Sequence, residues 1–424
     1  MSWVADTNTT ESIMRVRVYI ALFSLLIGIW CMGAERRVCE DCDYHNLARA
    51  VEEALPSDTI LVAAGSYKCP GLEITKPLVL IGAQGAILDG DNQNYVLRLL
   101  ADSIVVSGFS IINSGKSYTK DFAAIYVHGT SGVQILDNHI DNSFFGILVE
   151  KSKGGVIRGN TVSGTARQEN QAGNGVHLWH CNHMQIEKNE VFGMRDGIYL
   201  EFVDESDVIN NYTHNNVRYG LHFMFSNHDT YIDNTFESNG AGVAVMFSKW
   251  IRMEDNRFIN NWGTASYGLL LKEIYDGEVL NNLFEQNTLG IYVDGSSRVN
   301  YKGNTLRQNG WAIKVSGGCY ANAFTSNNFI GNSFDISYNS KMNDNTFNGN
   351  FWSEYSGYDL DRDGNGDVPY RPVKLFSYIV NRTPETIVLL RSLFVDLINF
   401  SEKVSPAFTP DDLIDQSPSM KKFQ

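Results

Sequence analysis

A short unit that recurs roughly every 22 residues constrains the fold of this chain more than any other feature of its sequence. Each copy contains glycine, an apolar residue, any residue and a second apolar residue, and an asparagine follows 14 positions after the glycine. The copies begin at Ala124, where alanine replaces glycine, and at Gly146, Gly175, Gly197, Gly220, Gly242, Gly268 and Gly290. Successive starts lie 22, 29, 22, 23, 22, 26 and 22 residues apart, so the unit has a fixed internal length and insertions occur between units. This pattern is typical of a solenoid.

The repeat predicts an all-β fold, a right-handed parallel β-helix with three short strands per coil. Apolar residues alternate with other types within each unit, and Asn and Gly lie between the units, as expected for short strands joined by turns. Equivalent residues of adjacent coils would stack about 4.8 Å apart, so the recurring asparagines should form a ladder of side-chain amides. The stretch "YHNLARAVEEAL" has helical apolar spacing and is expected to cap the open N-terminal end.

The N-terminal stretch "MRVRVYIALFSLLIGIWCMGAERR" has a basic start, an apolar run and small residues at its end. It predicts a signal peptide over residues 1–34, with translation starting at Met14. Lipoprotein processing before Cys31 is disfavoured because the bulky Trp30 precedes that cysteine. Export places the mature chain in an oxidising compartment.

The mature chain keeps five cysteines, so at least one of them must stay unpaired within the chain. They are Cys39, Cys42, Cys69, Cys181 and Cys319. Cys39 and Cys42 form a C-x-x-C, which is compatible with a local disulfide, with a bridge from one of the two to Cys69, or with a thiolate metal site.

The formal charge of −14, from 34 basic and 48 acidic residues, argues against nucleic acid or an anionic membrane as a partner. Both of those partners require a basic surface.

The strand alternation predicts which residues face outward. Two outward columns follow, Tyr126, Leu148, His177, Tyr199, His222, Ala244, Leu270 and Tyr292, and His128, Glu150, Trp179, Glu201, Met224, Met246, Lys272 and Asp294. His222, Met224 and Met246 are neighbours in these columns, with His177 two coils away. Thioether and imidazole ligands suit cuprous copper, so these four residues form a candidate copper site. A loop that covers this face would instead make the methionines ordinary packing.

The same face allows a second interpretation, a carbohydrate-binding or carbohydrate-cleaving β-helix. Glu150 and Glu201 would lie two coils apart, about 10 Å, which approaches the separation of the carboxylates in an inverting glycosidase. Trp179 would lie between them and could stack on a sugar ring.

After the repeats, "DLDRDGNGD" places oxygen ligands at Asp359, Asp361, Asp363 and Asp367 with a glycine at the bend. This spacing matches the first part of a calcium loop, although Tyr370 occupies the position of the closing acidic ligand. The alternative is a solvated acidic turn.

Thr383 and Pro384 predict the start of a helix with a broad apolar face. That face would contain Ile387, Leu390, Leu393, Phe394, Leu397, Ile398 and Val404. The charged residues Arg391, Asp396 and Glu402 interrupt the stretch, so it is not expected to span a bilayer. It should either cap the solenoid or contact a protein partner.

Several stretches resemble the NosD family over essentially the whole mature chain. They are "GNGVHLWHCNHMQIEKNEV", "RDGIYLEFVDESDVINN", "RYGLHFMFSN", "GAGVAVMFSK" and "ASYGLLLKE", and above all "GNFWSEYSGYDLDRDGNGDVPYRPVKLFSYIV" with the later "TPETIVLLRSLFVDLINF" and "SPSM". The resemblance implies a periplasmic, non-enzymatic accessory protein that binds an ABC transporter permease and ATPase. It further implies cooperation with a copper chaperone lipoprotein in supplying the copper sulfide centre of nitrous oxide reductase, with the segment after Pro372 contacting the permease. The chain has no G-x-x-x-x-G-K-[ST] motif, so ATP hydrolysis would belong to the partner.

The expected organisation is therefore a signal peptide over 1–34, a β-helix with its N-terminal cap over 35–355, an acidic Asp/Gly loop over 356–372 and a partner-docking segment over 373–424.

Overall fold

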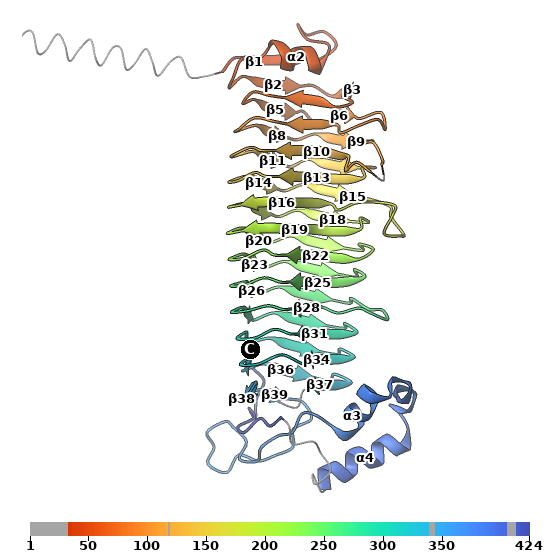
Figure 1. Cartoon of the computed structure of the whole chain (residues 1–424), viewed down its shortest axis with the longest axis vertical. Helices are drawn as coiled ribbons and strands as arrows, with labels where there is room; N and C mark the ends of the chain where they lie inside the picture. Colours follow the sequence, from red (N-terminus) through yellow and green to blue (C-terminus); the bar gives the residue numbers. More distant parts are fainter. Residues whose placement is uncertain (1–32, 118, 339–343, 405–412) are drawn as a thin grey trace, which may run out of the picture.

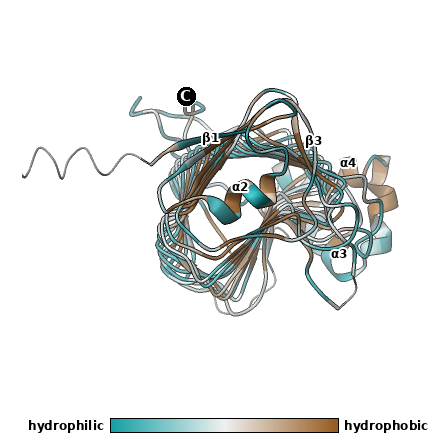
Figure 2. Ribbon diagram, turned by 90° about the horizontal axis from the view of Figure 1, so that it is seen from above, coloured by the Kyte–Doolittle hydropathy of each residue, from teal (hydrophilic) through white to brown (hydrophobic). Residues whose placement is uncertain are grey.

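The coils of a parallel β-helix are stacked along one axis in the computed structural model of the protein (Figure 1). The structure describes residues 33–117, 119–338, 344–404 and 413–424. The predicted signal peptide falls almost wholly on residues 1–32, which lie outside the described residues. Except at the two ends of the solenoid, each coil contributes one strand to each of three parallel sheets, and the view along the axis shows these sheets as the walls of a tube (Figure 2).

The first sheet contains 14 strands in the described part of the chain. They are β1 (Glu35–Val38), β2 (Thr59–Val62), β5 (Val79–Gly82), β8 (Val105–Ser107), β11 (Gln134–Leu136), β14 (Val156–Arg158), β17 (Gln185–Glu187), β20 (Asp207–Ile209), β23 (Thr230–Ile232), β26 (Arg252–Glu254), β29 (Glu278–Leu280), β32 (Asn300–Lys302), β35 (Ala323–Thr325) and β38 (Thr346–Asn348).

The second sheet follows it after a short turn in each coil. Its strands are β3 (Gly65–Lys68), β6 (Ala86–Asp89), β9 (Ser110–Ile112), β12 (His139–Asp141), β15 (Thr161–Ser163), β18 (Glu190–Phe192), β21 (Tyr212–His214), β24 (Thr235–Glu237), β27 (Arg257–Ile259), β30 (Leu283–Glu285), β33 (Thr305–Arg307), β36 (Asn328–Ile330) and β39 (Phe351–Trp352).

The third sheet carries the repeated Gly-φ-x-φ unit and has the longest strands. They are β4 (Leu72–Ile74), β7 (Leu97–Leu99), β10 (Ala123–His128), β13 (Phe145–Glu150), β16 (Val176–Asn182), β19 (Asp196–Asp204), β22 (Tyr219–Met224), β25 (Ala241–Met246), β28 (Leu269–Lys272), β31 (Leu289–Asp294), β34 (Trp311–Val315) and β37 (Phe334–Tyr338). Equivalent residues of adjacent units are paired in register, for example Ile198 with Leu221 and Leu221 with Val243. The predicted fold class is confirmed.

Apolar side chains fill the tube in columns that run along its axis. Phe236, Phe258 and Phe284 stack with ring centroids 5.3 Å and 4.5 Å apart. Each is fully buried, so this core grows by one layer per coil and stabilises each coil mainly against its neighbours.

The predicted asparagine ladder lies at the turn between the first and second sheets, and we call it the asparagine corner. It consists of Asn138, Asn160, Asn189, Asn211, Asn234, Asn256, Asn282, Asn304, Asn327 and Asn350, all of them buried. A second ladder, which was not predicted, runs through the turn between the second and third sheets as Asn216, Asn239, Asn261, Asn287, Asn309 and Asn332. These side chains satisfy backbone groups that turns would otherwise leave buried without partners.

Helix α2 (Leu47–Glu53) covers the N-terminal opening of the tube, as predicted (Figure 2). Asn46 caps it by accepting hydrogen bonds from the backbone N–H groups of Ala48 and Arg49. Cys39 and Cys42 form the local disulfide, and Cys69, Cys181 and Cys319 are buried free thiols. The sulfurs of Cys39 and Cys42 are therefore not available as thiolate ligands in this structure.

The C-terminal segment leaves the solenoid and returns to it. It forms α3 (Leu375–Arg382), the 3-10 helix η1 (Pro384–Leu389) and α4 (Leu393–Val404), which project to one side (Figures 1 and 2). The prediction of one continuous helix from Thr383 is wrong, because η1 ends at Leu389 and α4 begins at Leu393. The Thr383 hydroxyl also does not cap η1, since it donates to the Ile379 carbonyl of α3. None of the helices in the described residues is both long and apolar enough to cross a membrane.

The last described residues then close the solenoid. Asp415 and Ser419 bridge Phe347 and Phe351 as a partial extra coil. Residues 413–424 of the predicted docking segment thus belong to the end of the β-helix, and residues 375–404 form the part that projects to its side.

Candidate functional site

Two methionines lie side by side at the ends of strands of the third sheet. Met224 is the last residue of β22 and Met246 the last of β25, and the two are register partners. Both side chains are half-buried on the outer face. The Tyr199 hydroxyl of β19 lies 3.9 Å from the Met224 sulfur. This arrangement presents two soft thioether ligands from adjacent coils.

His222 lies two residues before Met224 in β22 but is covered. Its ring lies between those of Tyr199 and Tyr219, with centroid distances of 4.8 Å and 4.9 Å, and the residue is 6% exposed. Among the described residues neither ring nitrogen has a hydrogen-bond partner, and Nδ1 lies 3.8 Å from an Asp196 carboxylate oxygen. The expectation of an exposed His222 is wrong, because Tyr199 of the adjacent coil and Tyr219 of its own strand pack against its ring.

A partly buried ion pair lies next to His222. Asp196 is fully buried and accepts two hydrogen bonds from Arg218, at 2.8 Å from Nε and 2.5 Å from Nη2. Burial alone would raise the pKa of Asp196, but the hydrogen bonds from Arg218 outweigh it and hold this pKa below its ordinary value. The carboxylate is therefore charged and already paired with a cation.

His177 lies apart from the other three predicted copper ligands. The Tyr199 ring separates it from His222, with centroid distances of 4.7 Å to His177 and 4.8 Å to His222. Burial lowers the pKa of His177 to about 3, so its imidazole is neutral at physiological pH. The structure thus brings Met224 and Met246 together, with His222 beside them, and does not bring His177 to that pair.

Glu150 and Glu201, the carboxylates of the carbohydrate interpretation, flank Trp179 in register across three coils. Glu150 accepts a hydrogen bond from the Tyr126 hydroxyl at 2.8 Å and lies 3.2 Å from His128 Nδ1. The Lys151 ammonium lies 5.4 Å from the centroid of the Trp179 ring. The two acids therefore belong to coils that are separated by an intervening coil.

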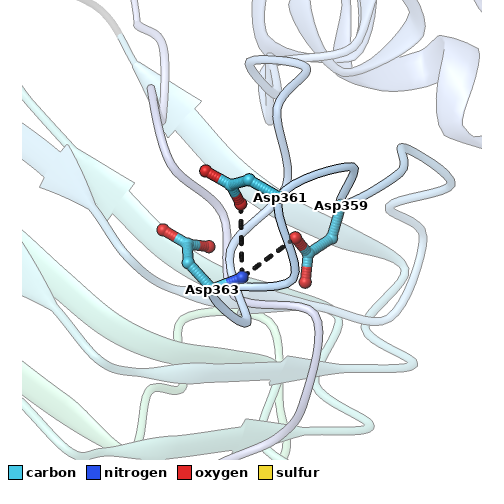
Figure 3. A group of neighbouring side chains, drawn as sticks. All are labelled: Asp359, Asp361 and Asp363. Carbon is cyan, nitrogen blue, oxygen red and sulfur yellow. Dashed lines mark hydrogen bonds between the residues drawn. The ribbon is translucent and has the colours of Figure 1, made fainter.

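The predicted calcium ligands are partly assembled in the acidic loop. Asp359, Asp361 and Asp363 have carboxylate oxygens within 4.8 Å of one another (Figure 3). The Asp363 backbone N–H donates to both Asp359 and Asp361, at 3.2 Å each. Asp367 instead accepts from the Leu360 N–H at 2.6 Å and is not in this group. The loop's own backbone thus occupies several of the carboxylate oxygens.

The helical segment 375–404 presents a large apolar surface. Phe376 and Val380 of α3 pack with Phe334 of the last coil and with Val395 of α4, and these contacts hold the segment against the solenoid. On the opposite side Val388 is 83% exposed and Leu393 is 73% exposed, and other apolar side chains are exposed around them. These are Ile387, Leu389, Phe394, Leu397 and Phe400. Such a patch indicates a docking surface.

A further surface was missed in the sequence. We call four residues the aromatic corner, namely His180, Phe202, Phe225 and Phe247. Each directly follows an outward residue of the third sheet, which is Trp179, Glu201, Met224 or Met246 respectively. The rings of the aromatic corner stack on one another on the outside of the solenoid. The signal was present at the fifth position after each of these four repeat glycines, but the left-handed backbone there interrupts the strand alternation that predicts which residues face outward.

A family model for "Periplasmic copper-binding protein (NosD)" matches residues 164–357. The chain is 28% identical over 381 residues to the "Probable ABC transporter binding protein NosD" of Pseudomonas aeruginosa, covering 85% of this chain and 87% of the relative. A protein of the same description from Stutzerimonas stutzeri is 25% identical and covers 84% of this chain and 86% of its own length.

Among solved structures, the A-module of the Azotobacter vinelandii mannuronan C-5 epimerase AlgE6 aligns with a TM-score of 0.59 at 12% identity. The alignment covers 73% of this chain and 94% of that one. The catalytic unit of an α-1,3-glucanase from Streptomyces thermodiastaticus aligns with a TM-score of 0.58 at 10% identity, over 73% and 66% of the two chains. At these identities the similarity concerns the fold alone.

Proposed function

Because the chain belongs to the NosD family, we propose that this periplasmic protein is the accessory subunit that works with an ABC transporter and a copper chaperone to assemble the copper sulfide centre of nitrous oxide reductase. The family is described as copper-binding and periplasmic, and the relatives are named as ABC transporter binding proteins. Copper is the cargo in this proposal, and the chain does not act as an enzyme.

The observation that carries the copper role is the register pairing of Met224 with Met246. Thioethers favour the cuprous ion and persist in an oxidising compartment where exposed thiols would be oxidised. His222, two residues before Met224, adds a buried imidazole whose ring nitrogens have no hydrogen-bond partner in the described part of the chain. A shallow site of this kind suits a protein that receives and releases copper.

The exposed apolar side of residues 375–404 supports the transporter role. Val388, Leu393 and Phe400 are exposed on η1 and α4, and the packing of α3 on the solenoid fixes their position. We propose that this surface contacts the permease of the transporter. ATP hydrolysis would then take place in a partner subunit.

The carbohydrate function remains the second candidate because Trp179 lies between Glu150 and Glu201. It predicts oligosaccharide binding that is lost in Trp179→Ala. The copper role predicts instead that Glu150→Gln and Glu201→Gln leave copper delivery unchanged.

An anaerobic competition titration with cuprous ion and a chromophoric chelator tests the copper role directly. The variant is Met224→Leu with Met246→Leu, since leucine keeps the volume and removes the sulfur. Met194→Leu with Met253→Leu is the matched control, because both of those methionines are fully buried in the core.

We expect tight cuprous binding in the wild-type protein and in the control, and at least a tenfold weaker affinity in the Met224/Met246 variant. Equal affinities in all three proteins would refute the ligand assignment.

A further inference from the structure

The backbone of the aromatic corner has the left-handed conformation. His180, Phe202, Phe225 and Phe247 have φ values of 51°, 54°, 50° and 55°. This region favours glycine and asparagine and disfavours bulky side chains. The same corner holds Gly129 and Lys151 in earlier coils and Glu273 and Gly295 in later ones, so four consecutive aromatic residues are a departure within this chain.

Burial does not explain these aromatic residues. Phe202 is 39% exposed and Phe225 is 38% exposed. The four rings form a nearly parallel stack, with centroids 4.6, 5.1 and 5.1 Å apart and interplanar angles of 6°, 8° and 12°. The fold would close equally well with polar residues at this corner, as the neighbouring coils show.

A hollow of about 750 Å³ runs beside the stack. The hollow is also lined by His228 and Trp250, whose rings stack at 4.5 Å, and by Asn182, Asp204, Asn227 and Lys249. Two aromatic stacks that extend over adjacent coils therefore line the hollow.

The stack adjoins the methionine pair. Phe225 directly follows Met224 and Phe247 directly follows Met246, so the aromatic corner begins where the two strands that carry the thioethers end.

We propose that the aromatic corner and its hollow are the docking surface for the copper-carrying protein that exchanges cuprous ion with Met224 and Met246. This inference rests on the proposed function and assigns the place of copper exchange on the molecule. The partner binds an apolar side chain in the hollow and holds its own copper ligands next to the methionine pair.

Two features of the surface favour a protein partner over a sugar. The inner rings cover one another's faces, whereas sugar recognition requires an open aromatic face, so the stack offers mainly ring edges to a ligand. Asp204 and Glu205 are exposed in the hollow with Lys249, so acidic groups exceed basic ones there. We therefore expect basic residues around the apolar contact of the partner.

The test uses the full mature protein and the purified soluble domain of its periplasmic copper chaperone, with and without cuprous ion. The variant is Phe202→Asn with Phe225→Asn, because asparagine tolerates the left-handed conformation. The matched control is Lys151→Asn with Glu273→Asn, at the same corner of coils without a phenylalanine there. Anaerobic biolayer interferometry gives the chaperone affinity, chelator competition gives the copper affinity, and circular dichroism verifies the fold.

We expect the phenylalanine variant to bind the chaperone at least tenfold more weakly and to keep its own copper affinity within twofold. The control should match the wild-type protein in both measurements. Should the double variant unfold, Phe225→Asn and Trp250→Asn are measured singly, and each should weaken docking at least threefold.

Unchanged chaperone affinity in the phenylalanine variant overturns the inference, and so does a wild-type protein that does not bind the chaperone. Binding of alginate or chitin oligosaccharides that disappears in this variant also overturns it, in favour of a sugar. Failure of the proposed copper role can be distinguished from failure of this inference. Met224→Leu with Met246→Leu should weaken copper binding and leave docking of the copper-free chaperone intact.

Discussion

The asparagine corner and the aromatic corner are both built from one residue per coil, yet they differ in burial and in composition. In the asparagine corner the same residue recurs in every coil from Asn138 to Asn350, and each side chain is buried. In the aromatic corner the residue type changes along the axis, and Phe202 and Phe225 are more than one-third exposed. One corner is uniform and internal, and the other is variable and external.

The difference follows from which groups each corner must satisfy. Each asparagine from Asn138 to Asn327 links three coils by donating to a backbone carbonyl of the previous coil and to the asparagine of the next one, as Asn234 does at 2.8 Å to Val208 and 3.0 Å to Asn256. Any coil without it would leave buried polar groups unpaired. The outer corner has no such requirement, so its residues are free to serve recognition.

The substitution Asn234→Ala tests the difference between the two corners with the largest expected effect on stability. The change removes hydrogen bonds to Val208 and Asn256 and those accepted from the N–H and side chain of Asn211. We expect a loss of roughly 3–5 kcal/mol in the free energy of unfolding, because buried groups lose their partners. Urea unfolding monitored by circular dichroism measures it, and a loss below about 1 kcal/mol would contradict the structural role of the ladder.

Asp415→Ala tests the last position of the asparagine corner. The buried Asp415 carboxylate accepts from the N–H of Gly349, the N–H and side chain of Asn350 and the indole of Trp352, at 3.0–3.1 Å. We expect a loss of roughly 2–4 kcal/mol and earlier proteolysis at the C-terminal end. Asp415→Asn keeps part of the acceptor function and is the control, so it should lose less stability than the alanine variant.

Asp229 lies in the turn between β22 of the third sheet and β23 of the first, and it tests whether a buried turn tolerates a carboxylate. It accepts from the Ser206 N–H at 2.9 Å and from the Tyr231 hydroxyl at 3.2 Å, and burial raises its pKa to about 8. The folded state therefore keeps a proton that the unfolded state releases above about pH 4, so stability should fall as the pH rises towards 8. Later coils have Asn322 and Asn345 at this position.

We expect Asp229→Asn to be more stable than the wild-type protein at pH 8 by roughly 1–2 kcal/mol, with a smaller difference at pH 5. Denaturation midpoints measured across this range check it. A wild-type midpoint that does not change from pH 5 to pH 8 would show that Asp229 does not carry this dependence.

The acidic loop offers a smaller test outside the coils. If Asp359, Asp361 and Asp363 hold calcium, then calcium at about five times its Kd should stabilise the protein by about 1 kcal/mol. Asp361→Asn should abolish this effect, and Glu169→Gln, an exposed acid in another loop, should keep it. Thermal unfolding with calcium and with a chelator measures the difference, and equal melting temperatures would leave a solvated turn as the correct interpretation.

Phe225→Asn should have the smallest effect on stability. The side chain is exposed and asparagine suits its backbone conformation, so we expect the free energy of unfolding to change by less than about 0.5 kcal/mol. A urea midpoint compared with that of Asn234→Ala measures the contrast. A loss above about 2 kcal/mol would mean that the aromatic stack holds the coils together, and the two corners would then be alike.

Much of the fold could be predicted because the repeat is local. A fixed spacing between glycine and asparagine defines where each turn falls, and the alternation within Gly220 to Phe223 defines which side chains enter the core. The site was less accessible to prediction. The pairing of Met224 with Met246 followed from the register, but the burial of His222 depends on Tyr199 and Tyr219 from two different strands.

The sequence by itself determined the coil, the asparagine corner and the core columns, since these follow from a fixed number of residues between glycine and asparagine that recurs in many coils. The tertiary structure decided which outward residues are covered, which aromatic residues stack in the open, and that Asp415 completes a ladder 65 residues after Asn350. The physical reason is that exposure and long-range hydrogen bonds depend on how separate segments pack, and a repeat period describes only the spacing within one segment.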